Sequence, residues 1–497
     1  MKIPEISGEI REDPESLERY STDLSGYQVR PRLVILPVHE KDVERILEFA
    51  LESGMPVTAR GAGSNLSGSA VGRGLLLHLR NMKAIEPLGG GIVRMQPGTV
   101  YEELNRRMAE KGLALRYDVS SGGFSTVGGN VATKAGGLRS IKYGTVDGSL
   151  AHLRFHCPYH GTVDTAGLLP PALERSIGIL RSRIERDQDT LGLLQRRRDL
   201  KSSSGYNLHA LVDYKDPAEI VSHLMVGSVG TLGILTSLTM NLVPLPRDRF
   251  LYAAFFNSIE SAVACAVGDL RSLNPSALEL IDDFGVTLAH DLNRIVVPPG
   301  ARAVLLIEFD ENPGNRQDLV ERPLGQYALS HQLIEDETTT EALWKIRWTM
   351  LTKIKKLHES GDHRYLSFID DLAVPPEKLV PFISEVKTIL GEEQLHSVIY
   401  GHVGEGNLHI RPLVGKRGWK QRVRRVTDRC VASALSYGGT LTAEHGSGRN
   451  RRQYLEKEWG RQVMGYFREI KKMFDPHDLL NPGVMFSSRD LTEDLHF

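Results

Sequence analysis

Hydrophobic positions in the first part of the chain repeat a strand–helix–strand pattern. Residues 33–37 form a short apolar run, and apolar side chains then recur at helical spacing through 42–54, which ends in a glycine. A glycine directly after the last periodic residue is typical of a helix C-terminus. A second unit follows, with a strand predicted over 92–96 and a helix that opens with a capping box of Thr99 and Glu102.

The pattern changes after a proline-bracketed stretch at 242–248. Before it, residues 171–200 carry helical periodicity and many charges, which predicts a helical insertion with a basic exposed face. After it, the strand-like runs 250–256 and 303–310 enclose a helical segment at 258–270, and glycines become fewer. We therefore predict an antiparallel sheet with helices on one face for this second region.

Glycine is concentrated in the first half. The chain has 48 glycines, and the densest clusters lie at 60–74, 125–137 and 227–233. Glycine lets bare backbone N–H groups approach phosphate oxygens closely. No cluster has G-x-G-x-x-G in register after the first strand, and none has the Gly-Lys-Ser/Thr of a Walker loop. One cluster alone is most simply a tight turn, but three indicate a long ligand with a diphosphate in its middle.

Size, charge and cysteine content narrow the class of protein. A chain of 497 residues is too long for one compact core, so two or three domains are expected. The net charge of −1 argues against a protein that coats nucleic acid or an anionic membrane. The three cysteines form no CxxC pair, which argues against a disulfide framework or a cysteine-held metal. We find no signal peptide and no run of about 18 apolar residues, so we expect a cytoplasmic protein, peripheral to a membrane only through a partner.

Two short stretches carry the clearest chemistry, GHVGEGNLH at 401–409 and AEHGSG at 443–448. Two imidazoles and one carboxylate make an open site for Zn²⁺ or a similar divalent ion. An α-hydroxy acid can chelate such an ion, which lowers the pKa of the hydroxyl while a neutral histidine takes its proton. The chain has 17 histidines, and the isolated ones are interpreted as surface or ordinary core residues, namely His39, His78, His160, His331 and His396.

The glycine clusters belong to longer motifs: PRLVILP, PVTARGAGSNLSGSAVGRGLLL, VRMQPGT, STVGGNVATKAGGLRSIKYGT and GSVGTLGI. These motifs resemble the FAD-binding domain of the vanillyl-alcohol-oxidase type flavoproteins. More narrowly, the chain resembles their D-lactate, glycolate and D-2-hydroxyglutarate dehydrogenase branch, from about residue 20 to about residue 485. The resemblance assigns FAD contacts to Arg60, Gly61, Gly63, Ser64, Asn65, Ser67, Gly68, Pro97, Gly98, Ser121, Thr126, Gly128, Gly129, Thr133, Gly136, Gly230, Thr231, Gly233 and Ile234, and to Asn481 near the isoalloxazine ring.

The resemblance also assigns roles at the histidine stretches. It implies His402, His409 and Glu444 as metal ligands and His445 as the general base. Glu405, where aspartate is common in the family, is expected to orient a ligand imidazole. Arg347 matches the family arginine that pairs with the substrate carboxylate.

Departures from the family pattern refine the expectation. No histidine lies between 39 and 78, the region where some members attach FAD covalently, so non-covalent FAD is expected. Lys134 replaces the usual asparagine and Val229 a common glutamate, and both changes could alter FAD affinity. Leu351 and Ile369 replace polar positions of the D-2-hydroxyglutarate enzymes. This loss favours a monocarboxylic substrate such as D-lactate.

The resemblance implies an α+β fold with a two-subdomain FAD-binding domain of the PCMH type and an antiparallel-sheet cap. We expect the FAD-binding domain at 1–245, the cap with the metal site at 246–445, and a C-terminal return to the FAD domain at 446–497. Because the chain stops at Phe497 without the cysteine-rich extension of the longer relatives, electrons should leave to a separate acceptor. That acceptor would be an iron–sulfur protein, an electron-transfer flavoprotein, a cytochrome or a quinone system. The protein itself would be a homodimer or a subunit of a complex.

Three alternatives stay open at this stage. The first is an O₂-using oxidase, or a glycolate or D-2-hydroxyglutarate enzyme, on the same fold. The second is a non-catalytic flavoprotein subunit of an electron-transfer complex. The third is a metal hydrolase without flavin.

Overall fold

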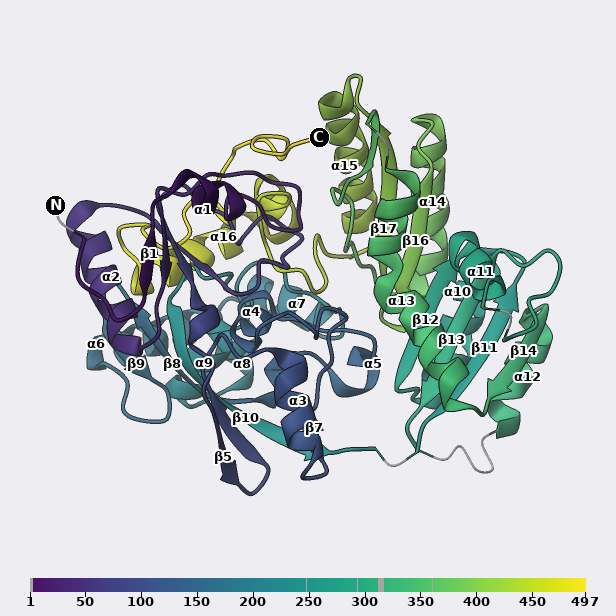
Figure 1. The fold of residues 1–497 in the computed structure, drawn as a ribbon, viewed down its shortest axis with the longest axis horizontal. Helices are drawn as coiled ribbons and strands as arrows, with labels where there is room; N and C mark the ends of the chain where they lie inside the picture. Colours follow the sequence, from purple (N-terminus) through teal and green to yellow (C-terminus); the bar gives the residue numbers. More distant parts are fainter. Residues whose placement is uncertain (1–2, 247, 293, 312–316, 360) are drawn as a thin grey trace.

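The computed structural model describes residues 3–246, 248–292, 294–311, 317–359 and 361–497. Figure 1 shows two lobes. The first lobe contains a four-stranded and a six-stranded sheet, and the second contains a seven-stranded sheet. No helix in these described residues is long and apolar enough to cross a membrane.

The four-stranded sheet of the first lobe has the order β1-β2-β4-β3. Its last three strands run parallel, because α2 (Glu40–Ser53) connects β2 to β3 in a crossover. The helix ends at Gly54, which adopts a left-handed φ of 67° as the sequence predicted. The strands are β1 (Glu9–Arg11), β2 (Leu33–Leu36), β3 (Val57–Arg60) and β4 (Leu75–His78).

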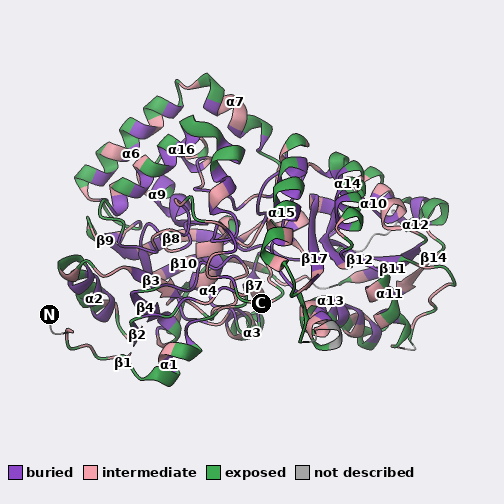
Figure 2. Cartoon of the chain, turned by 90° about the horizontal axis from the view of Figure 1, so that it is seen from above, coloured by how far each residue is buried: buried purple, intermediate pink, exposed green. Residues whose placement is uncertain are grey.

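The six-stranded sheet is antiparallel and has the order β5-β6-β10-β8-β9, with β7 also paired to β10. Helices α6 and α7, in the predicted insertion, have exposed outer sides, whereas the central strands β8 and β10 are mostly buried or half-buried (Figure 2). The strands are β5 (Ile85–Gly89), β6 (Ile92–Met95), β7 (Leu113–Leu115), β8 (Leu150–Cys157), β9 (Gly161–Asp164) and β10 (Ile234–Pro244). The helices of this lobe include α1 (Pro14–Arg19), α3 (Tyr101–Ala109), α4 (Val127–Thr133), α5 (Ser140–Tyr143), α6 (Pro171–Ile184), α7 (Gln188–Arg196), α8 (Ala210–Asp213) and α9 (Pro217–Met225).

The predicted capping box at Thr99 is wrong. Helix α3 begins at Tyr101 after Val100, and no side chain caps it. The backbone carbonyl of Thr99 instead accepts from the N–H of Val127. Thr99 is therefore hydrogen-bonded to the first residue of α4 instead of capping α3, and this tertiary contact overrides the local capping signal.

The seven-stranded sheet of the second lobe is antiparallel, with the order β14-β11-β13-β12-β16-β17-β15. Helices cover both of its faces, so the prediction of helices on one face is wrong. On β11, Tyr252 and Phe256 pack in the core that includes α10 and α14, whereas Leu251 and Phe255 pack in the core that includes α11 and α13. The continuous apolar runs of β11 and β13 reflect burial on both sides.

The elements of the second lobe follow one another from residue 250 to residue 436. Its strands are β11 (Phe250–Phe256), β12 (Ala277–Asp282), β13 (Ala303–Phe309), β14 (Ser330–Ile334), β15 (His363–Tyr365), β16 (Ser397–His402) and β17 (Asn407–Gly415). Its helices are α10 (Ile259–Gly268), α11 (Asp283–His290), α12 (Gln317–Tyr327), α13 (Glu337–His358), α14 (Leu379–Glu392) and α15 (Trp419–Ser436).

The C-terminal segment returns to the first lobe (Figure 1). Its helix α16 (Leu455–Phe474) places the buried Lys471 so that Nζ donates to the carbonyl oxygens of Thr231 and Leu480. The backbone N–H of Val57 in turn donates to Leu479. The last fifty residues therefore complete the wall of the first lobe behind its glycine loops.

Candidate functional site

A cavity of about 310 Å³ lies between the two lobes. The glycine loops of the first lobe form one side of it. The other side comes from α13, β16 and β17 of the second lobe, together with Glu444 and His445. The site is therefore assembled from segments that lie more than 300 residues apart in the sequence.

The glycine loops are packed so closely that they present bare backbone to the cavity. A side chain on Gly61 would place its Cβ 2.3 Å from Oγ1 of Thr126, and one on Gly128 would meet Pro97 at 2.5 Å. Such distances leave no room for any residue but glycine at the two positions. An elongated, glycine-walled cavity of this kind fits a dinucleotide whose phosphates are held by backbone N–H groups.

Most of the residues assigned to FAD line this cavity. They are Arg60, Gly61, Gly63, Ser64, Asn65, Pro97, Ser121, Thr126, Gly128, Gly129, Thr133, Gly136, Gly230 and Gly233.

Six residues assigned to FAD do not line the cavity: Ser67, Gly68, Gly98, Thr231, Ile234 and Asn481. They support its wall instead. Nδ2 of Asn481 donates to the carbonyl oxygens of Ser69 and Val229 at 2.8 Å each, and Thr231 donates to Ser228. Motif matching could not separate the wall from its support, because both are parts of the same loops.

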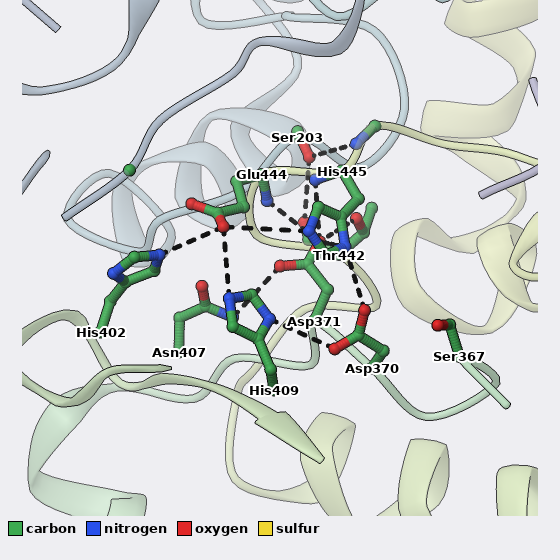
Figure 3. Close-up of polar contacts among 12 residues, drawn as sticks. Ser203, Ser367, Asp370, Asp371, His402, Asn407, His409, Thr442, Glu444 and His445 are labelled. Carbon is green, nitrogen blue, oxygen red and sulfur yellow. Dashed lines mark hydrogen bonds and ion pairs between the residues drawn. The ribbon is translucent and has the colours of Figure 1, made fainter. Parts of the chain in front are cut away.

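The predicted metal ligands converge on one oxygen atom (Figure 3). Oε1 of Glu444 lies 3.1 Å from Nε2 of His402 and 3.4 Å from Nε2 of His409. Two ligand atoms that each lie about 2.1 Å from one ion are about 3.0 to 3.4 Å apart at octahedral or tetrahedral angles. These two spacings fit a divalent ion, although His402 is not among the four described residues, Asp371, His409, Glu444 and His445, whose ligand atoms all lie within 4.8 Å of one another.

Hairpin β16–β17 positions the two imidazoles. In its register His402 pairs with Asn407, and Tyr400 pairs with His409, so the two histidines lie on adjacent strands two residue pairs apart. The turn includes Gly406 at a φ of 71°, where a Cβ would collide with the carbonyl oxygen of Val374 at 1.9 Å. The Gly-rich spacing in the sequence thus corresponds to a hairpin that places two imidazoles on adjacent strands.

Acidic side chains hold the far nitrogen of each imidazole. Nδ1 of His402 lies 2.5 Å from Glu279, and Nδ1 of His409 lies 3.2 Å from Asp370. The hydrogen bond of His402 fixes the tautomer that leaves its Nε2 free for a metal, whereas Nδ1 of His409 and Oδ1 of Asp370 lie close together without hydrogen-bond geometry. The prediction that Glu405 orients a ligand imidazole is wrong, because Glu405 contacts Ser140 and Lys201.

Asp371 lies close enough to be considered as a ligand. Asp371, His409, Glu444 and His445 each offer an atom within 4.8 Å of the others. Both oxygens of Asp371 are, however, already used: Oδ2 accepts from Thr442 and from the backbone N–H groups of Glu444 and His445, and Oδ1 accepts from Asn407. We therefore assign Asp371, which has a left-handed φ of 72°, to holding the loop of Glu444 rather than to the ion.

His445 is the most accessible of these histidines, with its side chain 20% exposed. Its ring stacks on that of His409 at 5.3 Å, and Nδ1 lies 3.4 Å from Asp370. Nε2 lies 3.9 Å from Oε1 of Glu444. His445 lies beside the candidate metal position and lines the cavity, as a proton acceptor must.

Lys201 is a site residue that the sequence analysis missed. Its buried Nζ lies 2.9 Å from Oε2 of Glu444 and 3.0 Å from Oε2 of Glu405. Burial raises the pKa of the Glu444 carboxyl, but the charges of His402 and Lys201 outweigh burial and hold that pKa well below its usual value. Glu444 is thus an anion at neutral pH. In the sequence, Lys201 appears only as a lysine before three serines, and this pattern does not indicate which residue it contacts.

Two buried arginines, Arg347 and Arg411, line the cavity on the side of the second lobe, and they differ in whether every nitrogen has a hydrogen-bond partner. Nε of Arg347 donates to Glu279 at 2.6 Å, whereas the buried Nη2 has no hydrogen-bond partner among the described residues. Each nitrogen of Arg411 has a partner, because Nε donates to Tyr400, Nη1 to Ser367 and Nη2 to Asp370. Arg347 is therefore the one with a donor available for an anion.

The other side chains around Arg347 are largely apolar. Trp348, Leu351 and Tyr400 line the cavity next to it. Trp348 is 45% exposed although it is a large aromatic residue. This end of the cavity suits a small anion with an apolar substituent.

Comparisons with known proteins agree with this geometry. Residues 31–166 match the family described as an FAD binding domain, and residues 245–485 match the C-terminal domain of FAD linked oxidases. Glycolate oxidase subunit GlcD of Bacillus subtilis is 28% identical, over 98% of this chain and 96% of its own. D-lactate dehydrogenase of Archaeoglobus fulgidus is also 28% identical, over 97% and 98%. D-2-hydroxyglutarate dehydrogenase of Haemophilus influenzae is 24% identical over 100% of this chain and 52% of its own.

Among solved structures, alkyldihydroxyacetonephosphate synthase superposes with a TM-score of 0.65 and 17% identity. The match covers 95% of this chain and 82% of the other, and it confirms the fold alone. A dinucleotide cavity closed by an antiparallel cap defines an FAD-linked oxidoreductase, and the two domain matches agree. Within that class the chain belongs to the FAD-linked oxidase family, in its D-lactate, glycolate and 2-hydroxyglutarate dehydrogenase type.

Proposed function

We propose that this enzyme oxidises a small D-2-hydroxy acid, D-lactate or a close analogue, to the 2-oxo acid with non-covalent FAD and a divalent ion. One observation carries the proposal: Oε1 of Glu444 lies within 3.1 and 3.4 Å of His402 and His409, at the edge of a glycine-walled cavity. A hydroxy acid has two oxygens in the positions that such an open metal site binds.

Each protein group has a task in this reaction. His445 accepts the hydroxyl proton, and Asp370 beside its Nδ1 stabilises the imidazolium that forms. Arg347 holds the substrate carboxylate through Nη2. When bound, FAD supplies the hydride acceptor and the ion polarises the hydroxyl.

The cavity lining supports a monocarboxylic substrate. Arg60, Arg347 and Arg411 are the arginines among the described residues that line the cavity, and each nitrogen of Arg411 already has a protein partner. Arg60 donates to the carbonyl oxygens of Thr22 and Ala70 within the first lobe. Arg60 keeps an unpaired Nε but belongs to the first lobe, so beside Arg347 a second substrate carboxylate would meet Leu351, which offers only apolar contact.

An anaerobic screen of D- and L-2-hydroxy acids against the yellow protein tests the proposal. We expect D-lactate to bleach the flavin, L-lactate to do so far more slowly, and treatment with a chelator to abolish bleaching reversibly. If no 2-hydroxy acid bleaches protein that holds FAD and metal, a non-catalytic flavoprotein subunit becomes the better interpretation.

We further propose that the electrons pass to a separate acceptor rather than to O₂. Stopped-flow reoxidation of the reduced flavin in air distinguishes the two. Slow reoxidation that a dye accelerates is expected, and fast reoxidation in air alone would make the protein an oxidase.

A further inference from the structure

Glu279, in the middle of β12, contacts two functional groups that the proposed function treats separately. Its Oε1 lies 2.5 Å from Nδ1 of His402, and its Oε2 lies 2.6 Å from Nε of Arg347. Its side chain is 0% exposed. We propose that Glu279 is a shared positioning residue, which sets the metal-ligand imidazole and the arginine for the substrate carboxylate at the same time.

The fold gives Glu279 this place through three elements. Strand β12 pairs with β16, with Leu280 opposite Gly401, so the residue before Leu280 lies near the end of β16 that carries His402. Helix α13 brings Arg347 over the ring of Tyr400 at 4.9 Å, from the face of the sheet opposite to α10. One carboxylate thus meets a strand and a helix that are far apart in the sequence.

Each oxygen of Glu279 restricts one partner. The contact with Nδ1 keeps that nitrogen protonated, so the lone pair of His402 lies on Nε2, which faces Glu444. Oε2 of Glu279 accepts from Nε of Arg347, and the buried Nη2 of the same guanidinium has no hydrogen-bond partner among the described residues. The metal and the carboxylate of one substrate are therefore positioned by a single buried anion.

Replacement by glutamine would break this double role. A glutamine has one acceptor oxygen and one NH₂ group, so one of the two N–H donors would face another donor in a buried place. The proposal rests on the proposed function, because it assumes that His402 binds the ion and that Arg347 binds the substrate.

Two binding constants of the FAD-loaded protein test the inference without turnover. The first is the dissociation constant of Zn²⁺, measured by competition with a chromogenic chelator. The second is the dissociation constant of pyruvate from protein whose metal a chelator has removed. It is measured from the change that pyruvate causes in the flavin absorption spectrum. We expect Glu279→Gln to weaken Zn²⁺ binding by about 10- to 100-fold. We expect it to weaken pyruvate binding by about 10-fold, because Arg347 loses the charged hydrogen bond that holds its guanidinium in place.

Glu308→Gln is the matched control. Glu308 lies on the neighbouring strand β13, is buried, and holds Arg139 through both oxygens at 2.7 and 2.8 Å. It touches neither the histidines nor Arg347. The control should lower the melting temperature as much as Glu279→Gln does, while both binding constants stay within about twofold of the wild type. A loss of stability alone therefore cannot imitate the expected result.

Arg347→Met and Glu279→Asp complete the set. Arg347→Met should weaken pyruvate binding and leave Zn²⁺ binding nearly unchanged. Glu279→Asp keeps the charge on a shorter arm, so it should weaken both constants by less than glutamine does, and it replaces the glutamine variant if that one fails to fold. The inference is overturned if the Glu279 variants change only one constant or neither. If wild-type protein binds neither Zn²⁺ nor pyruvate and no hydroxy acid bleaches it, the proposed function fails as well.

Discussion

Lys134 and Val229, which depart from the family pattern, both occupy left-handed backbone. Their φ angles are 55° and 47°. Asparagine tolerates this conformation better than lysine, and a β-branched valine is among the least suited residues. The usual asparagine at position 134 therefore has a backbone reason. Lys134 does not line the large cavity, so its effect is on local strain rather than on FAD contact.

Lys134→Asn should raise the free energy of unfolding by about 0.5 to 1 kcal/mol, because asparagine relieves part of the left-handed strain. Urea unfolding of the holoprotein measures this change. The same exchange at exposed Lys356, inside helix α13, should instead lower the free energy slightly, because asparagine is a poorer helix former than lysine. A destabilised Lys134→Asn variant would show that the lysine has a compensating contact.

His445→Ala should keep the yellow colour and lose turnover by about 10²- to 10⁴-fold, the usual contribution of a general base. The side chain lines the cavity, and its contacts with His409, Asp370 and Asp371 lie within the candidate site, so folding and FAD binding should persist. Steady-state rates with D-lactate measure the effect. Exposed His396 provides the control, since His396→Ala should leave the rate unchanged. An unaltered rate in His445→Ala would remove the histidine from its role.

At the scale of elements, the hairpin and the glycine loops follow from the sequence more readily than the faces of the cap sheet. Strands β16 and β17 flank the turn at 403–406, where glycines join two apolar runs. The two-sided burial of β11 and β13 was present in their unbroken apolar runs, but periodicity alone does not say what covers each side. Helices far along the chain decide that.

Asp282 at the end of β12 caps helix α11 and gives a pH-dependent stability. Burial raises its pKa to about 7, whereas an aspartate in an unfolded chain titrates near about 3.9. As the pH rises between these values, the unfolded chain loses this proton before the folded protein does, so the folded state becomes relatively less stable. Asp282→Asn cannot ionise. Its stability relative to the wild type should therefore improve by on the order of 1 to 4 kcal/mol between about pH 4 and about pH 8.

Asp336→Asn, at the N-terminus of α13, is the control of opposite sign. Hydrogen bonds from the backbone and side chain of Thr339 lower the pKa of exposed Asp336. The stability that ionised Asp336 contributes is therefore lost as the pH falls. The free energy of unfolding of the asparagine variant should thus lie furthest below that of the wild type at high pH. Chemical unfolding at several pH values measures both variants. Parallel curves for Asp282→Asn and the wild type would contradict the expectation.

At the scale of the whole molecule, buried polar contacts fix the second lobe against the first. Helix α5 lies at the edge of the first lobe that faces the second (Figure 1). Arg139 next to it binds Glu308, and Lys142 in it binds Asp310 at 2.5 Å. Deeper in the interface, Lys201 joins Glu405 of the second lobe to Glu444. Of these contacts, those of Lys201 reach the candidate site itself, so the position of Glu444 depends on them.

Lys201→Met should destabilise the protein by about 3 to 5 kcal/mol, because it leaves two buried carboxylates without their cation. Thermal unfolding and Zn²⁺ binding measure the effect, and we expect metal affinity to fall as Glu444 loses its fixed position. Adding Glu405→Gln should recover part of the stability. Lys142→Met, which also removes a lysine between the lobes but at a more exposed place, should cost about 1 kcal/mol or less. Equal losses in both variants would contradict the role of burial.

The sequence by itself determined the local pieces: the glycine loops of the FAD cavity, the hairpin that carries His402 and His409, and the adjacent Glu444 and His445. These are short motifs whose residue types follow from backbone crowding and from ligand chemistry. Only the tertiary structure decided that Glu279, Asp370 and Lys201 hold those groups, and that Glu405 serves the lysine rather than an imidazole. Glu279 lies more than one hundred residues from His402, and Lys201 more than two hundred from Glu444, and nothing in the local pattern around them indicates those contacts.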